Sequence, residues 1–114
     1  MIDRQKPDPV FLKIIADVRA DGNGSSRRKE QIVALLKDID LTVRCSAHED
    51  SSPGYLCEYG SRPLARLVGL CGLDSSIVQK CLNRIRDSPY DGYGYCRGEV
   101  DRLTKRWIPA GVVI

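Results

Sequence analysis

Six polar residues fall on one side of a helix that the sequence predicts between Asp74 and Pro89. They are Ser75, Ser76, Gln79, Lys80, Asn83 and Arg86. Gln79 and Asn83 are four positions apart, so both project from the same side of the helix. Their amides can pair with an adenine edge, and Lys80 can reach guanine acceptors or a phosphate. The two serines, beside the helix N-terminus, suit phosphate contact. This pattern predicts a surface that binds double-stranded DNA.

The alternative for this helix is an ordinary solvated face. Every amphipathic helix has a polar outer side, and periodicity alone does not separate the two interpretations. The helix carries no carboxylate between Ser75 and Arg86, which favours an anionic partner. The opposite side is expected to pack in the core and consists of Ile77, Val78, Cys81, Leu82 and Ile85.

A second short helix is predicted immediately before the first. It opens near Ser61 and ends at Gly72, and its inward positions are Leu64, Leu67, Val68 and Cys71. Asp74 or Ser75 then caps the following helix, which proline at position 89 stops. Two short helices joined by a glycine-containing turn predict a helix-turn-helix over residues 61–87.

The N-terminal part predicts two further helices. Asp8 before Pro9 is a capping residue followed by proline at the first helical position, so a helix is expected over 9–20. Residues 1–24 are interpreted as a helical extension and as the dimer element of a homodimer. A second helix is expected from Ser25 or Ser26 to about Asp38. Its first turn holds Arg27, Arg28 and Lys29, although the helix dipole disfavours cations there.

Two segments favour strands. Residues 41–60 alternate at LTVRC and YLCEY around the turn-like HEDSSPG, which is typical of a hairpin or of two short strands. Residues 93–114 are interpreted as two strands joined by a basic loop, although Val100, Leu103 and Trp107 also fall at helical spacing. In the strand interpretation four cations would hold the DNA backbone or enter the minor groove: Arg97, Arg102, Lys105 and Arg106.

Residues 64–86, LARLVGLCGLDSSIVQKCLNRIR, resemble the helix-turn-helix of winged-helix regulators. The similarity is closest to the multiple-antibiotic-resistance repressors, through Gly72-Leu73-Asp74 followed by Ser76 and Val78. The segment CRGEVDRLTKRWIP also resembles the wing of small pilus-operon regulators, which place a basic, threonine-containing wing ahead of a tryptophan. The resemblance implies a DNA-binding transcriptional regulator.

The fold class expected from these elements is α+β. We expect one winged helix-turn-helix domain over residues 1–114, with a helical core and a small antiparallel β-sheet. Neither a glycine-rich phosphate loop nor a pair of catalytic carboxylates is present, so we expect a non-enzyme without cofactor. The chain carries a net charge of +3, and residues 61–114 hold nine Lys and Arg against five Asp and Glu. A protein-binding adaptor without DNA affinity remains the main alternative.

The five cysteines raise a third alternative, a zinc-stabilised interaction module. Cys45 and His48, followed by Cys57, have half of the spacing of a zinc site, but a second close pair is missing. Buried or surface thiols are therefore the expected state. No signal peptide and no run of about 18 apolar residues is found, which favours the cytoplasm and no membrane association.

Overall fold

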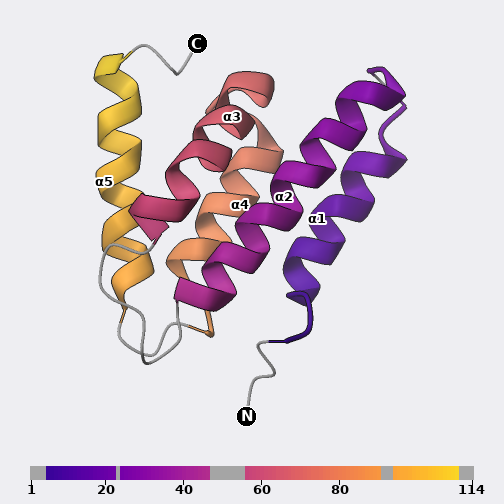
Figure 1. The fold of residues 1–114 in the computed structure, drawn as a ribbon. Coiled ribbons are helices and arrows are strands. Elements are labelled where there is room, and N and C mark those ends of the chain that lie inside the picture. Colours follow the sequence, from indigo (N-terminus) through magenta and orange to yellow (C-terminus); the bar gives the residue numbers. More distant parts are fainter. Residues whose placement is uncertain (1–4, 23, 47–55, 91–93, 111–114) are drawn as a thin grey trace.

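The computed structural model describes residues 5–22, 24–46, 56–90 and 94–110, and every regular element in these ranges is helical. Figure 1 shows α1 and α5 on opposite sides of the molecule, with α2, α3 and α4 between them. The elements in chain order are α1 (Pro9–Ala20), α2 (Ser26–Ser46), the π-helical turn η1 (Leu56–Gly60), α3 (Ser61–Cys71), α4 (Ser76–Arg86) and α5 (Tyr95–Ala110).

The expected α+β class is wrong, because no strand is present in the described ranges. Residues 41–46 continue α2, and residues 56–60 form η1 instead of the second strand of a hairpin. The segment interpreted as the wing is α5. Residues 47–55, 93 and 111–114, which belong to the predicted hairpin and wing, lie outside the described ranges.

Burial of one helical stripe explains why α5 is a helix. Cys96, Val100, Leu103 and Trp107 follow each other at intervals of four, three and four residues, and each is at most 4% exposed. A strand would turn half of these side chains towards solvent. The core contact along the whole stripe therefore outweighs the β-propensity of tyrosine and valine in this segment. Continuation of α2 has the same cause, because Ile39 and Val43 extend its buried stripe.

The core lies between α2 and the helices that pack around it. α2 contacts α1, α3 and η1, while α4 contacts α1, α3 and α5. The helix expected over 9–20 is confirmed as α1, with Asp8 accepting a hydrogen bond from the backbone N–H of Val10 at 3.0 Å. Phe11 of this helix is fully buried. The segment interpreted as an N-terminal extension thus contributes to the common core.

Neighbouring helices account for the cations in the first turn of α2. The Nη2 atom of Arg28 donates to the carbonyl of Leu70 at 2.5 Å, in the last turn of α3. Lys29 donates to the carbonyl of Asp21, the C-terminal cap of α1. The last carbonyls of a helix lack intrahelical partners and carry partial negative charge. The N-terminus of α2 therefore caps the C-termini of both helices beside it.

The two glycines near the start of α5 give a test of its helical structure. Gly98 lies inside the helix with open space where a Cβ would sit, whereas Gly94 precedes the helix at a φ of 74°. We expect Gly98→Ala to stabilise the fold by about 0.5–1 kcal/mol, since alanine favours helix over glycine. Gly94→Ala is expected to cost about 1 kcal/mol, because that φ disfavours a side chain. Urea unfolding of both variants measures the difference, and equal effects would contradict this boundary of α5.

Candidate functional site

The pair α3–α4 has helix-turn-helix connectivity, with four residues, 72–75, between the helices. Gly72 adopts a φ of 88°, and its N–H donates to the carbonyl of Val68 at 2.7 Å, which closes α3. Ser75 caps α4 by accepting a hydrogen bond from the N–H of Ile77 at 3.2 Å. The predicted turn glycine and serine cap are confirmed. Because its hydroxyl caps the helix, half-buried Ser75 is less available for phosphate than expected.

The polar residues of α4 lie where the sequence places them. Val78, Cys81, Leu82 and Ile85 are buried, and four predicted contact residues are exposed: Ser76, Gln79, Lys80 and Asn83. The two amides are already partly engaged, however. Nε2 of Gln79 donates to the carbonyl of Leu73 at 2.7 Å, and Oδ1 of Asn83 accepts from Nη1 of Arg86 at 3.2 Å. Bidentate pairing of either amide with adenine would require that amide to exchange its present hydrogen bond.

Carboxylates from adjoining elements pair with the cations of this surface. Lys80 Nζ lies 3.7 Å from an oxygen of Asp17 on α1, and Arg86 Nε lies 3.0 Å from Asp101 on α5. A hydrogen bond from Lys13 and the charges of Lys13 and Lys80 hold the pKa of Asp17 below its ordinary value. α4 and its neighbours thus form a surface of mixed charge.

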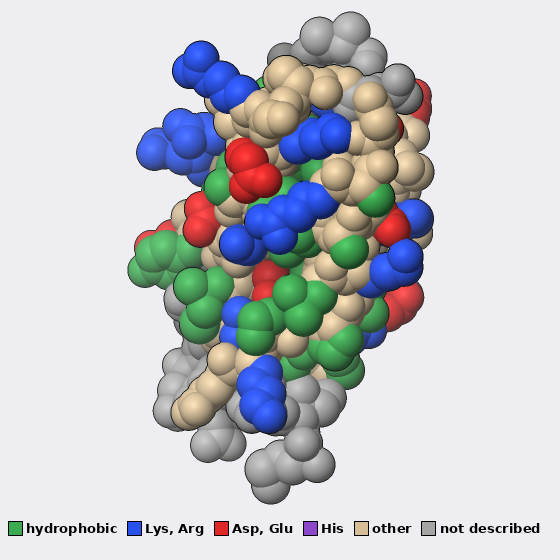
Figure 2. All heavy atoms as spheres, turned by 90° about the vertical axis from the view of Figure 1, so that its right-hand side faces the viewer, with side chains coloured by type: hydrophobic (Ala, Val, Ile, Leu, Met, Phe, Trp, Pro, Cys, Tyr) green, Lys and Arg blue, Asp and Glu red, His purple; other side chains and the backbone are tan. Residues whose placement is uncertain are grey.

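The space-filling view supports this description for the side of the molecule on which α1 lies. Figure 2 shows Lys and Arg side chains interspersed with Asp and Glu over this face, with hydrophobic side chains below them. A groove of about 440 Å³ runs here between α1 and α4. Its lining joins Lys13 and Asp17 of α1 to Lys80 and Asn83 of α4.

The four cations assigned to a wing are exposed on α5, but they do not form one group. Arg97 lies on the α4 side, with its Nη2 atom 2.5 Å from a carboxylate oxygen of Asp87. Arg102 and Arg106 are close enough to the Cys57 thiol on η1 to act on it electrostatically. A helix turns by about 100° per residue, so positions 97 and 106 face opposite sides. The predicted single basic wing, which included Lys105, is therefore corrected to cations on different sides of a helix.

A buried ionic network connects α1, α2 and α4, and no pattern in the sequence predicts it. Arg84 binds the carboxylate of Asp8 through two hydrogen bonds, Nε at 2.7 Å and Nη2 at 2.9 Å. Asp40 and Arg44 on α2 form a second pair at 3.2 Å, and the backbone N–H of Asp8 donates to Asp40. Burial raises the pKa of Asp40 despite the hydrogen bonds from Arg44. The four-residue spacing of Asp40 and Arg44 is visible in the sequence, but their burial is not.

The thiols do not form a metal centre or a reactive site in the described ranges. Among the described residues no group of three or more His, Cys, Asp or Glu could hold a metal ion, and His48 lies outside them. Cys45 is exposed, whereas Cys57 is half-buried and donates to the backbone carbonyl of Glu99. Burial, with the nearby Glu99 charge, raises the pKa of Cys57, and burial strongly raises that of Cys81. Raised pKa values keep these two thiols protonated and poorly nucleophilic.

No protein-family model, no curated protein and no solved structure matches the chain. Within the described ranges, none of the helices combines the length and the apolar character that crossing a membrane requires.

Proposed function

We propose that this protein binds double-stranded DNA through α3 and α4 and acts as a small transcriptional regulator. The observation that carries the proposal is the exposed polar side of α4 behind a four-residue turn: Ser76, Gln79, Lys80 and Asn83 are all accessible. An α-helix fits the major groove, where such side chains can contact base edges. All five cysteines, each within the described ranges, are thiols and not disulfides, which fits a cytoplasmic location.

The ion pairs around α4 set the electrostatics of this proposed binding. A phosphate approaching Lys80 competes with Asp17, and one approaching Arg86 competes with Asp101. Phosphate contacts release counterions from DNA, and each contact steepens the dependence of affinity on salt. A surface with its cations already paired should therefore bind duplex weakly and gain affinity when a pairing carboxylate is removed.

Removal of charge on either side of one ion pair tests the proposal. Lys80→Ala should weaken binding to a random-sequence duplex and lower the slope of log K against log salt by about 1. Asp17→Asn should strengthen binding by about two- to fivefold at low salt, because Lys80 becomes available to phosphate. Fluorescence anisotropy with a labelled duplex, repeated from low to physiological salt, measures both effects.

Two variants on α2 provide matched controls for these charge changes. Lys37→Ala and Glu30→Gln make the same changes in net charge at exposed positions that do not line the α1–α4 groove, and Glu30, like Asp17, is paired with a cation, Arg19. If they shift affinity as much as their counterparts do, binding depends on net charge alone and α4 is not the contact surface. Absence of salt-sensitive duplex binding by the unmodified protein would exclude DNA binding as its function.

A homodimer is part of the same proposal, with α1 as the dimer element. Two-fold symmetric proteins match palindromic DNA sites, so a symmetric pair would place two α4 helices on successive turns of the duplex.

A protein-binding adaptor is the second candidate function. Its supporting observation is the pairing of Lys80, Arg86 and Arg97 with carboxylates, which leaves little net attraction for phosphate on this surface. In the anisotropy experiment, absence of salt-sensitive duplex binding would favour the adaptor.

A further inference from the structure

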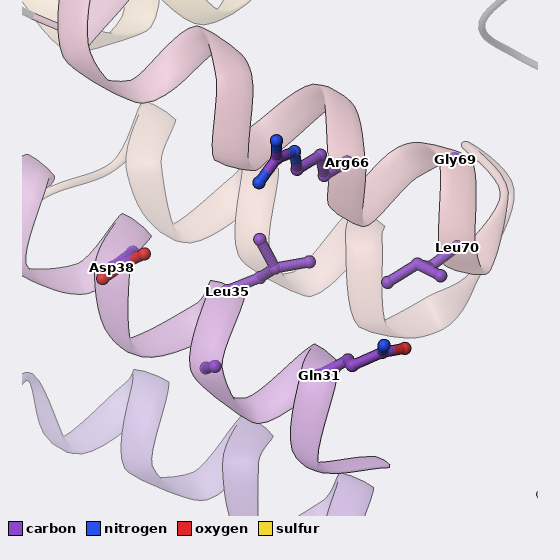
Figure 3. Close-up of a pocket in the computed structure, with 7 residues that line it drawn as sticks. Gln31, Leu35, Asp38, Arg66, Gly69 and Leu70 are labelled. Carbon is purple, nitrogen blue, oxygen red and sulfur yellow. The ribbon is translucent and has the colours of Figure 1, made fainter. Parts of the chain in front are cut away.

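An open groove between α2 and α3 has an apolar floor. Its volume is about 550 Å³, and its lining residues are Gln31, Ala34, Leu35, Asp38, Arg66, Gly69 and Leu70. Figure 3 shows Leu35 of α2 and Leu70 of α3 pointing into the space between the two helices, with Arg66 above Leu35. Leu70 is 36% exposed. Gly69 deepens the groove, because nothing lies within 4 Å of the place where its Cβ would be.

Positive charge follows the α3 side of this groove. Arg66 lines it, Arg62 precedes Arg66 by one helical turn, and Arg28 is held beside Leu70 by its hydrogen bond to the Leu70 carbonyl. Neither Arg62 nor Arg66 has a carboxylate partner among the described residues. One carboxylate, that of Asp38, lies on the α2 side of the lining. The groove therefore combines an apolar floor with a cationic edge.

We propose that this groove is a docking site for an acidic amphipathic helix of a partner protein. An amphipathic helix inserts apolar side chains three, four and seven positions apart into a groove of this kind. The complementary apolar surface consists of Ala34, Leu35 and Leu70. An apolar floor favours a protein ligand over the charged backbone of a nucleic acid. Asp and Glu on the α3-facing flank of the ligand would pair with Arg62 and Arg66 and fix its orientation.

This site does not overlap the side of α4 that is proposed to contact DNA. The groove is lined by α2 and α3 alone, and none of its residues belongs to the exposed side of α4. A regulator could therefore hold DNA through α4 while a partner occupies the groove. Binding of a peptide to the groove is measured without DNA, so its result does not depend on DNA binding.

A peptide library displayed on phage tests the ligand chemistry directly, using the full-length chain as bait. The library consists of 16-residue helical peptides in which acidic and basic residues are equally frequent. Selected peptides should carry a leucine stripe flanked by Asp or Glu, and they should bind in solution with Kd values of about 1–100 μM. Enrichment of basic or uncharged peptides, or failure to select any binder, would overturn the proposal.

Gly69→Gln shows whether the selected peptides occupy the groove. Glutamine favours helix, so folding is expected to be retained, while its side chain fills open space above the groove floor. Peptide affinity should fall by at least about tenfold, as expected when an apolar pocket is blocked. Gly98→Gln on α5 is the matched control, because Gly98 is also helical and also has nothing within 4 Å of its Cβ position. Equal affinity of both variants for the peptide would place the binding elsewhere and refute the site.

Charge reversal separates a protein ligand from DNA at the same surface. The double variant Arg62→Glu/Arg66→Glu should prefer lysine-flanked versions of the selected peptides over acidic ones by about tenfold. The affinity of the double variant for duplex DNA should fall only by the amount expected from its lower net charge. If the double variant instead loses salt-dependent duplex binding and keeps the acidic peptides, the cationic edge is a phosphate contact and the proposed ligand is wrong.

Discussion

Arg84→Met is expected to lower the free energy of unfolding by about 3–5 kcal/mol, because it leaves the Asp8 carboxylate buried without its charged partner. The Asp8 side chain is 2% exposed, and its two oxygens accept hydrogen bonds from Arg84 at 2.7 and 2.9 Å. The carboxylate of Asp40 is also close to it and adds like charge. Urea unfolding monitored by circular dichroism measures the loss.

The double variant Asp8→Asn/Arg84→Met separates the charge from the packing of the side chains. Asparagine caps a helix about as well as aspartate, so the hydrogen bond to the N–H of Val10 can persist. Removing the buried anion should restore about 1–3 kcal/mol relative to Arg84→Met alone, as coupled pairs do in double-mutant cycles. If the stability losses of Asp8→Asn and Arg84→Met simply add in the double variant, the unpaired buried charge is not the cause of the Arg84→Met effect.

Phe11→Ala is expected to cost about 3–5 kcal/mol, the second large effect, because the ring is fully buried between α1 and the rest of the core. A domain of this size has a total stability of about 5–15 kcal/mol, so the variant should be close to unfolding at 37 °C.

Leu12→Ala is the matched control, since Leu12 adjoins Phe11 in the same helix and is 49% exposed. It should change stability by no more than about 0.5 kcal/mol, as surface substitutions do. Thermal unfolding of both variants distinguishes the two possibilities for α1. A mild effect of Phe11→Ala would mean that α1 is an appendage, as the sequence predicts for residues 1–24.

Local chemistry was enough to predict the ends of several helices. Asp8 with Pro9 set the start of α1, Gly72 ended α3, and Ser75 capped α4, because a cap or a positive φ depends on a few adjacent residues. The stripe of Val78, Cys81, Leu82 and Ile85 was likewise readable from its spacing and is buried. These features explain why the helix-turn-helix connectivity of α3 and α4 was predicted from residues 61–87.

Whether residues 41–46 and 95–110 form strands or helices depends on contacts with residues that are distant in the sequence. Both segments contain β-branched or aromatic residues, and their local preferences are weak enough for tertiary packing to override them. Burial of Val43 in the core and of Val100, Leu103 and Trp107 against the same cluster selects the helix. The absence of a wing in the described ranges follows from that burial, and so does the separation of Arg97 from Arg106.

The sequence by itself determined the residue types of the polar α4 side and their spacing. Only the tertiary structure decided which carboxylates stand beside the cations: Asp17 comes from α1 and Asp101 from α5. The same holds for the pair of Asp8 and Arg84, which are 76 positions apart. Periodicity reports which side of one helix is polar, whereas the electrostatics of a surface depend on every element that packs beside it.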